Sequence, residues 1–292
     1  MVFYFCIVKP IYITREFLFG FITAAFAEDV GNGDHSTLAS IPEKAESRAR
    51  LLVKDEGIIA GIELAIDIFH HFDKGLVVKA SLKDGDEVKK GDVAFTVAGN
   101  ARSILTSERL VLNCMQRMSA IATKTRLLSR LIEGTHARIL DTRKTTPNFR
   151  LLEKWAVLIG GGKNHRIGLS DMIMLKDNHV DFAGGIEQAI NRTKDYLRAH
   201  KLDLLIEIEV RNLDEVREVV RVGGADVIML DNMTVDDMKK AVQLISGSGK
   251  TEASGGITEE TIRTIAESGV DYISVGALTH SVKSMDLSLK AF

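Results

Sequence analysis

Two glycine-rich segments near the C-terminus decide the fold: Lys250-Thr-Glu-Ala-Ser-Gly-Gly-Ile257 and Gly269-Val-Asp-Tyr-Ile-Ser-Val-Gly-Ala277. In each, a short stretch with the pattern of a strand runs into glycine, and a helix is expected between them over residues 258–268. Glycine-rich loops after the last two strands of an α/β barrel present backbone N–H groups to a phosphate. The segments therefore predict a phosphate site formed by Ser254, Gly255, Gly256 and Gly276.

The same strand–helix alternation extends upstream to residue 134, with further strands expected at residues 138–140, 172–175, 204–210 and 227–230. Helices of about 10–15 residues separate most of these strands, which predicts a parallel sheet closed into an α/β barrel. The carboxyl ends of barrel strands carry the active site. Charged residues at or just after these ends are therefore candidate site residues: Arg143, Lys144, Lys176, Glu209 and Asp231.

A run of glycines and cations, Gly160-Gly-Gly-Lys-Asn-His-Arg166, lies between two of the expected strands. Consecutive glycines let the backbone approach a ligand closely, and His165 and Arg166 follow them. With the cations of Asp141-Thr-Arg-Lys-Thr-Thr-Pro147, the run predicts a site for a small molecule that carries several negative charges. Asp141 is expected to orient these loops rather than act as a base, and Glu207 is expected to be structural.

The first third of the chain predicts a separate small α/β domain, with strands at residues 45–56, 76–82 and 93–98 and a helix at 62–72. The turn-rich stretch 83–92 resembles the turn of a lipoyl or biotinyl carrier. The lysine context that a carrier modifies is missing from the sequence. A structural β-rich domain is therefore the favoured interpretation.

A long helix is expected over residues 106–133, capped by Thr106 or Ser107 and ended by Gly134. Arg109, Asn113 and Gln116 recur at helical spacing and form one polar stripe. Surface stripes usually carry Lys and Glu, whereas this one carries two amides. The composition favours a contact surface over a solvated face.

The N-terminal region has two interpretations. The apolar run from Phe17 to Ala27 has the form of a signal-peptide core, but Arg15 and Glu16 adjoin it and it is too short for a membrane span. The favoured alternative is an amphipathic helix over residues 14–28, with one face that consists of Phe17, Phe21, Ala24 and Ala25. Residues 1–13 are expected to be an extension.

Composition limits the partners. The 292 residues carry a formal net charge of −2, so no global basic field favours nucleic acid, and no membrane partner is expected. The two cysteines, Cys6 and Cys114, lack metal-ligand spacing and fit a reducing cytoplasm better than a disulfide scaffold.

Seven segments, in this order along the chain, resemble the quinolinate phosphoribosyltransferase family, also called decarboxylating nicotinate-nucleotide pyrophosphorylase. They are Glu108-Arg-Leu-Val-Leu-Asn-Cys-Met-Gln-Arg117, Asp141-Thr-Arg-Lys-Thr-Thr-Pro147, Gly160-Gly-Gly-Lys-Asn-His-Arg166, Leu175-Lys-Asp-Asn-His179, Asp231-Asn-Met233, Glu252-Ala-Ser-Gly-Gly256 and Gly276-Ala-Leu-Thr-His280. The similarity runs from about Thr14 to the C-terminus. It departs from the family pattern at Asn148-Phe149, where Gly-Leu is usual, and in the extension before Thr14.

The resemblance implies a two-domain fold: an N-terminal α/β sandwich of hammerhead type at residues 14–115, joined by 281–292, and an open α/β barrel of type II phosphoribosyltransferases at 116–280. It implies that quinolinate and phosphoribosyl pyrophosphate react with Mg²⁺ to give nicotinate mononucleotide, pyrophosphate and CO2, a step of NAD biosynthesis. It also implies a cytoplasmic homodimer.

The resemblance further implies the roles of individual residues. Those that bind quinolinate are Arg109, which crosses from the partner subunit, and Arg143, His165, Arg166 and Lys176. Those assigned to catalysis are Lys144 on the pyrophosphate side and Glu209 and Asp231 at the ribose hydroxyls or Mg²⁺. Those that bind the 5′-phosphate are Ser254, Gly255, Gly256 and Gly276, with His280 beside them.

Two alternatives stay open. One is a paralogous phosphate-binding barrel enzyme of unknown substrate, which would lack part of the dicarboxylate-binding set. The other is a non-catalytic sensor of nicotinate-type ligands, which would lack the acids at 209 and 231. Retention of Arg109, Arg143, His165 and Arg166 argues against the first, and the presence of both acids argues against the second.

Overall fold

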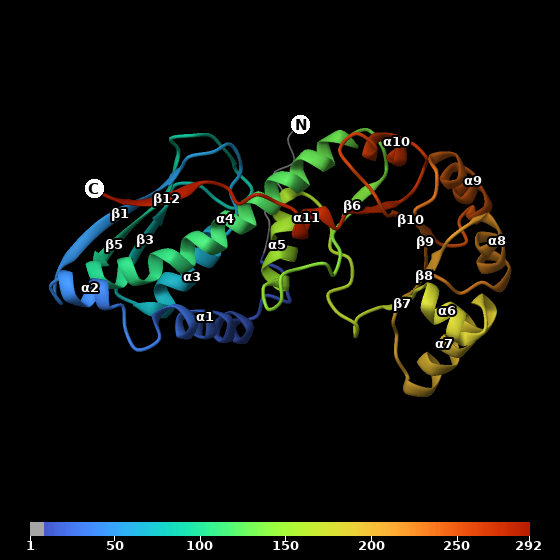
Figure 1. Ribbon diagram of the computed structural model, residues 1–292, viewed down its shortest axis with the longest axis horizontal. Coiled ribbons are helices and arrows are strands. Elements are labelled where there is room, and N and C mark those ends of the chain that lie inside the picture. The colour runs from blue at the N-terminus through green and yellow to red at the C-terminus, as the bar shows by residue number, and fades with distance from the viewer. Residues whose placement is uncertain (1–8) are drawn as a thin grey trace. The chain divides into compact units, whose positions relative to one another are not determined.

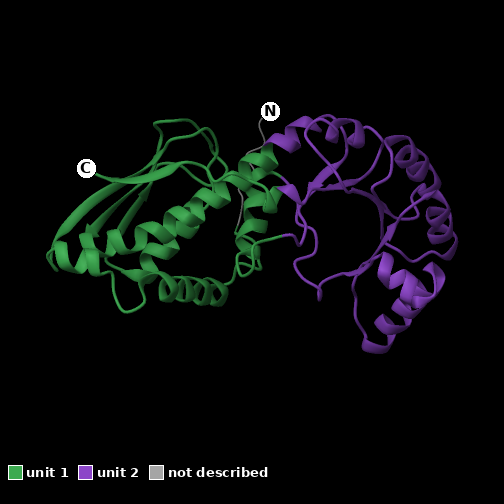
Figure 2. Cartoon of the chain, viewed as in Figure 1, with its two compact units in different colours: residues 1–126, 145–161, 278–292 green, residues 127–144, 162–277 purple. Residues whose placement is uncertain are grey.

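The computed structural model describes residues 9–292, which form two compact units (Figure 2). Unit 1 comprises the described residues up to Arg126, Thr145–Gly161 and Leu278–Phe292, and unit 2 comprises Leu127–Lys144 and Gly162–Ala277. The division differs from the boundary expected at residues 115 and 116. Helix α4 (Ala101–Leu131) runs through that point without a break, and the segment 145–161 returns to unit 1.

Unit 1 contains a four-stranded sheet in the order β12-β1-β5-β3 (Figure 1). Its strands are β1 (Glu46–Val53), β3 (Val77–Ala80), β5 (Val93–Asn100) and β12 (Leu287–Ala291). The last strand pairs antiparallel with β1, so the C-terminal segment joins the N-terminal sheet as predicted. The turn-rich stretch forms a second, two-stranded sheet from β2 (Gly57–Ile58) and β4 (Glu87–Val88).

The helices of unit 1 are α1 (Arg15–Val30), α2 (His35–Ser40), α3 (Ile62–Phe72), α4, α5 (Arg150–Gly160) and most of α11 (Ala277–His280). Helix α3 packs on the sheet, with the rings of Phe69 and Phe95 5.9 Å apart and perpendicular. Helix α4 is tied to the β2 region because Ser119 Oγ accepts from the Ala60 N–H at 2.9 Å. These contacts bury the apolar faces that the sequence periodicity predicts.

The prediction for the start of α4 was wrong. The helix begins at Ala101, and the side chain of Asn100 accepts the backbone N–H of Ser103 at 3.1 Å, which is the bond of an N-cap. Ser107, one of the two residues expected to cap it, is buried and donates instead to the Ser103 carbonyl one turn back. A hydroxyl that bonds within the helix leaves no signal of its own in the sequence.

Helix α1 forms where the amphipathic interpretation places it, capped by Thr14, whose Oγ1 accepts from Phe17 N. Its buried side chains are Leu18 and Ile22, so the apolar face is turned from the predicted one. Among the described residues, no helix is both long and apolar enough to span a bilayer. Most of the predicted extension 1–13 lies outside the described residues, but Ile13 is buried within unit 1.

Unit 2 is built on a six-stranded parallel sheet in the order β6-β11-β10-β9-β8-β7. Its strands are β6 (Arg138–Leu140), β7 (Ile173–Leu175), β8 (Ile206–Val210), β9 (Val227–Asp231), β10 (Lys250–Ser254) and β11 (Tyr272–Ser274). The sheet curves, and the helices lie along its outer side (Figures 1 and 2). Within the described residues β6 and β7, the two end strands of the sheet, do not pair with each other, so the predicted α/β barrel is confirmed as an open one.

The helices that connect these strands are α6 (Asp177–Ala183), α7 (Ile186–His200), α8 (Leu213–Val222), α9 (Val235–Ile245) and α10 (Ile262–Ala266). Helix α10 is shorter than the predicted helix over residues 258–268. The Thr261 hydroxyl accepts the Thr258 N–H at 3.0 Å, so a side-chain turn replaces the first helical turn.

Candidate active site

Acidic residues line the inner side of the unit 2 sheet. Glu207 and Glu209 lie two residues apart on β8 and therefore face the same way, as do Glu252 and Ser254 on β10. The register places Asp231 opposite Ser254, at the carboxyl ends of β9 and β10. Glu207 and Glu252 are buried, whereas the residues nearer the strand ends are partly exposed. The exposed end of this surface is the carboxyl edge, as in other barrels.

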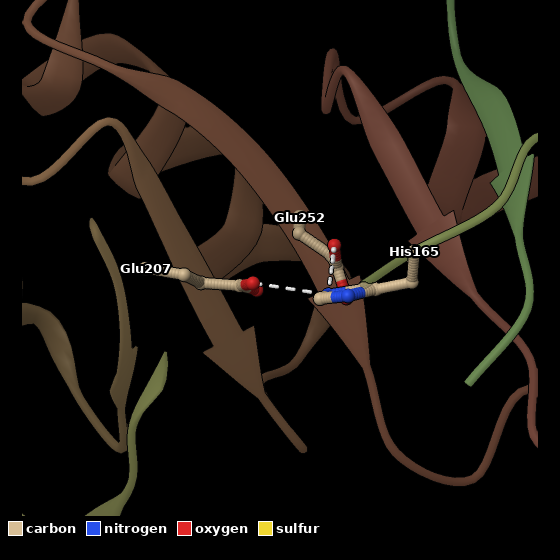
Figure 3. A group of neighbouring side chains, drawn as sticks. All are labelled: His165, Glu207 and Glu252. Atoms are coloured by element: carbon tan, nitrogen blue, oxygen red, sulfur yellow. Dashed lines mark ion pairs between the residues drawn. The ribbon is translucent and has the colours of Figure 1, made fainter. Parts of the chain in front are cut away.

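His165 projects between the two buried glutamates (Figure 3). Its Nε2 lies 3.0 Å from Oε2 of Glu207 and 3.5 Å from Oε2 of Glu252. The His165 side chain is 6% exposed, and the two carboxylates are 0% and 1% exposed. Both contacts fall within ion-pair distance, but neither has the geometry of a hydrogen bond.

The backbone fixes the proton on this ring. Nδ1 of His165 accepts the N–H of Arg166 at 2.7 Å, so in this arrangement the ring proton belongs on Nε2, which faces Glu207. The other side of the loop is held by Asp141, which is buried. Its carboxylate accepts the His165 N–H at 2.9 Å and the Asn164 side-chain amide at 2.6 Å. Asp141 thus orients the loop, as the sequence predicted.

The cluster favours a bound proton. The pKa of Glu252 rises from its ordinary 4.5 to about 8, mainly because burial disfavours the charged form. The neighbouring Glu207 and Asp141 raise it further, while His165 and the Ser274 hydroxyl oppose the shift. Three acids within one dry region therefore act on a single histidine.

Two arginines, Arg143 and Arg166, lie near the cluster of His165, Glu207 and Glu252. Burial lowers the pKa of Arg166, and the positive charge of Arg143 lowers it further, which places the two guanidinium groups within electrostatic reach of each other. Arg166 donates to the Met172 carbonyl at 3.3 Å. Two neighbouring guanidinium groups repel each other, so an anion with two charges would stabilise both.

Two residues with separately predicted roles form a pair. Nζ of Lys176, at the end of β7, lies 2.9 Å from Oε2 of Glu209 at the end of β8. Lys176 is half exposed, whereas Glu209 is only 12% exposed. The family resemblance predicts a role for the lysine at the dicarboxylate and for the acid at the ribose or metal, and these two side chains are in direct contact.

The predicted phosphate loop has the required backbone form. Gly255 and Gly256 both have positive φ, at 94° and 60°. A Cβ at Gly255 would also collide with the side chain of Asn232, whose amide donates to Asp231 at 2.8 Å. Glycine is therefore needed at residue 255 both for its conformation and for space. Ser254 and Gly276 end β10 and follow β11 respectively, as predicted.

Two predicted site residues, Arg109 and His280, belong to unit 1. Arg109 and Asn113 are exposed on α4, while Gln116 of the same stripe donates to the Leu287 carbonyl at 3.0 Å. His280 is exposed at the end of α11, with Nδ1 2.6 Å from the Ser281 hydroxyl. Lys144, in unit 2, is exposed.

The sequence analysis did not predict the contacts of three buried acids. Glu207 was expected to be only structural, and Glu252 and Glu153 were given no role. Glu153 is buried in unit 1, where it accepts from Arg117 at 2.8 Å and from the Thr146 hydroxyl at 2.9 Å. The available signal was the placement of Glu207 and Glu252 inside strands, each between apolar or small neighbours in the chain.

An open parallel barrel with a glycine loop, carboxylates at its carboxyl edge and cations near them is the form of a barrel enzyme that acts on an anionic substrate. Comparison with known proteins narrows the class. The model of the quinolinate phosphoribosyl transferase C-terminal domain matches residues 121–290, and that of the N-terminal domain matches residues 34–119. The chain belongs to the quinolinate phosphoribosyltransferase family.

Individual relatives support this family membership. The chain is 49% identical to the chloroplastic nicotinate-nucleotide pyrophosphorylase [carboxylating] of Arabidopsis thaliana, over 92% of this chain and 81% of that protein. It is 44% identical to the probable nicotinate-nucleotide pyrophosphorylase [carboxylating] of Bacillus subtilis, over 90% of each. The crystal structure of NadC from Streptococcus pyogenes superposes with a TM-score of 0.90 at 38% identity, over 95% of this chain and 97% of that one.

Proposed function

We propose that this chain carries out the reaction for which its relatives are named. It joins quinolinate to the ribose of phosphoribosyl pyrophosphate and releases pyrophosphate and CO2, leaving nicotinate mononucleotide. The observation that carries the proposal is that Arg166 feels the charges of both Arg143 and the buried Glu207, in a barrel whose carboxyl edge holds Lys176 and Glu209 2.9 Å apart. That combination suits one ligand with two carboxylates and another with a phosphorylated ribose.

Quinolinate occupies the cationic part of the site. Its two adjacent carboxylates need several donors in fixed positions, and guanidinium groups bind carboxylates through two parallel hydrogen bonds. Arg143 and Arg166 provide these, His165 and Lys176 add charge, and Arg109 completes the set. The buried Asp141 keeps the loop that carries His165 and Arg166 in position.

Phosphoribosyl pyrophosphate occupies the carboxyl edge. Ser254 and the backbone of Gly255, Gly256 and Gly276 receive its 5′-phosphate, because glycine loops offer unobstructed N–H groups. Lys144 lies on the pyrophosphate side. Glu209 and Asp231 hold the ribose hydroxyls, and their negative charges stabilise positive charge at the anomeric carbon as the pyrophosphate bond breaks.

Mg²⁺ fits the same acids. Glu209 and Asp231 offer the hard carboxylate oxygens that Mg²⁺ prefers, and both are partly exposed, which leaves room for substrate and water ligands. Bound there, Mg²⁺ would neutralise charge on the pyrophosphate group. Lys176 now pairs with Glu209 at 2.9 Å, and it is released to the dicarboxylate when the acid turns to its own ligands.

The chemistry needs no protein nucleophile. The quinolinate nitrogen attacks the anomeric carbon as the bond to pyrophosphate breaks, and the pyridine ring becomes cationic. The bond between C2 and its carboxylate then breaks, CO2 leaves, and the electron pair stays on C2, where the adjacent positive ring nitrogen stabilises it until C2 takes a proton from water. The protein holds the ring nitrogen in line with the ribose and keeps solvent ordered.

A homodimer is part of the proposal. Arg109 and Asn113 are exposed on α4 in the single chain, which leaves them available to a partner subunit. Mixed subunits test this directly. When Arg109→Ala and Arg143→Ala proteins are combined, exchange produces dimers with one intact site, and activity should return; no recovery after verified exchange contradicts Arg109 in trans.

The compartment also belongs to the proposal. We place the protein in the cytoplasm on its two cysteines, of which Cys114 is buried, with its pKa raised to about 12 by burial, and Cys6 lies outside the described residues. Curated plant relatives carry chloroplastic and mitochondrial names, so fractionation of cells that produce the tagged chain is the deciding measurement.

The reaction itself is tested with purified protein. Quinolinate, phosphoribosyl pyrophosphate and Mg²⁺ are supplied together, and CO2 and nicotinate mononucleotide are measured, with each component omitted in turn. Equal amounts of the two products support the proposal. Product from nicotinate in place of quinolinate, with none from quinolinate, would contradict it.

A further inference from the structure

We propose that Glu207 and Glu252 are positioning residues that act on quinolinate through His165. They hold the ring in place and stabilise the doubly protonated imidazole that a substrate carboxylate requires. The inference rests on the proposed function and adds to it two buried acids and a change in protonation when the dicarboxylate binds.

The contacts of the His165 imidazole determine which ring nitrogen carries its proton. Nδ1 accepts the Arg166 N–H at 2.7 Å, and Nε2 faces Glu207 at 3.0 Å and Glu252 at 3.5 Å. A neutral ring in this position has its single proton on Nε2, directed at the acids. It therefore presents no N–H to a ligand. To donate to a substrate carboxylate, the ring must gain a proton on Nδ1 and give up the bond from Arg166.

The second argument is the charge around the ring. An imidazolium that is 6% exposed is costly unless opposite charges face it. Glu207 on β8 and Glu252 on β10 face Nε2, and Asp141 holds the backbone N–H of His165. The opposing cations are Arg166, next in the chain, and Arg143, whose charge acts on Arg166. The buried groups nearest the ring are thus acids.

The third argument is that this cluster already favours an added proton. Burial together with Glu207 and Asp141 raises the pKa of Glu252 to about 8, so the excess of buried negative charge draws protons into the cluster near neutral pH. A bound dicarboxylate brings two more negative charges to the same region. Binding of quinolinate should therefore be coupled to uptake of a proton by the ring.

The test is calorimetric titration of quinolinate into the full-length protein at pH 8, repeated in buffers of different ionisation enthalpy. The dependence of the heat on the buffer gives the protons taken up. The wild-type protein should take up close to one proton per quinolinate. Glu207→Gln keeps the size of the side chain but removes its charge, so proton uptake should fall and the Kd should rise about tenfold.

A matched control uses the same exchange of chemistry on the surface. Glu187 pairs with Arg221 at 2.8 Å and both are exposed, so Glu187→Gln should bind quinolinate with wild-type affinity and uptake. Glu252→Gln offers a second buried variant should Glu207→Gln not fold, with a change in the same direction but smaller, because Glu252 keeps part of its own proton at pH 8. Circular dichroism and thermal unfolding establish which variants are folded.

Three results would overturn the inference. One is wild-type binding of quinolinate without proton uptake. Another is unchanged affinity and uptake in a folded Glu207→Gln or Glu252→Gln protein. The third is stoichiometric zinc in the purified wild-type protein that Glu207→Gln loses, because His165, Glu207 and Glu252 converge closely enough to bind a metal. Failure of the proposed function is separate, since it appears as a wild-type protein that makes no nicotinate mononucleotide.

Discussion

Nε2 of His165 lies 3.0 Å from Oε2 of Glu207, and the carboxylate is fully buried within the barrel of unit 2. The contact connects the loop that carries the cations to the strand that carries the acids. The loop that carries His165 also carries Arg166, whereas Glu207 belongs to the strand that ends near Glu209. Substitution of either residue should therefore alter the positions of both the carboxylate-binding cations and the acids at the strand ends.

Arg143→Ala should weaken quinolinate binding more than it slows the chemical step. Loss of a guanidinium removes paired hydrogen bonds to a carboxylate, so kcat/KM for quinolinate should fall about a hundredfold or more, mainly through KM. Steady-state kinetics at saturating phosphoribosyl pyrophosphate measure this. Nearly normal kcat/KM for quinolinate would remove Arg143 from the binding set.

Asp231→Asn should have the opposite profile. The side chain stays the same size and can still contact the Asn232 amide region, but it loses the charge that opposes the cationic ribose in the transition state. We expect kcat to fall about a hundredfold, with the Kd for quinolinate nearly unchanged. A large loss of quinolinate affinity with intact turnover would contradict this role.

Arg117→Ala should destabilise unit 1. The arginine donates to Glu153 at 3.0 and 2.8 Å and also contacts the Thr279 carbonyl, while Glu153 is fully buried. Removal leaves a buried carboxylate without its counter-charge, at a cost of about 3 kcal/mol in the free energy of unfolding. Urea denaturation measures it.

The matched control for that variant is Arg217→Ala. Among the residues that the structure describes, Arg217 pairs with the highly exposed Asp214, so no measurable change in the free energy of unfolding is expected. Equal effects of the two substitutions would show that the Arg117–Glu153 pair has no special stabilising role.

Glu252 should make stability depend on pH. Its folded-state pKa of about 8 lies above the ordinary 4.5, so between these values the folded protein keeps a proton that the unfolded chain has released. Stability should therefore fall as pH rises from about 4.5 to about 8 and then level off. Glu252→Gln lacks this dependence, so it should gain stability relative to wild type between pH 5 and pH 9. A stability difference that does not change with pH would be inconsistent with the raised pKa.

Local patterns allowed the sequence to predict most of the elements. The helix near residues 14–28, the helix at 62–72 and the parallel strands of unit 2 each depend on residues close together in the chain, and all were confirmed. The glycines at 255 and 256 have the positive φ expected of a loop that approaches a ligand. Such features follow from local conformational preference and periodicity.

The long-range relationships could not be predicted in the same way. His165, Glu207 and Glu252 are distant in the sequence, and only the curvature and register of the sheet bring them together. The alternation along the strand placed Glu207 and Glu209 on one face, but it could not predict that Glu207 contacts a histidine and Glu209 contacts a lysine. The pairing of Lys176 with Glu209 likewise depends on the adjacency of β7 and β8.

The central claim is that the site transfers phosphoribose to quinolinate and removes the carboxylate next to the ring nitrogen. Quinolinate labelled with ¹³C separately at its C2 and C3 carboxylates tests this most directly. The account predicts that all of the C2 label appears as CO2 and all of the C3 label stays in nicotinate mononucleotide, one for one. Release of the C3 label, or a nucleotide product that retains both carboxylates, would contradict the account.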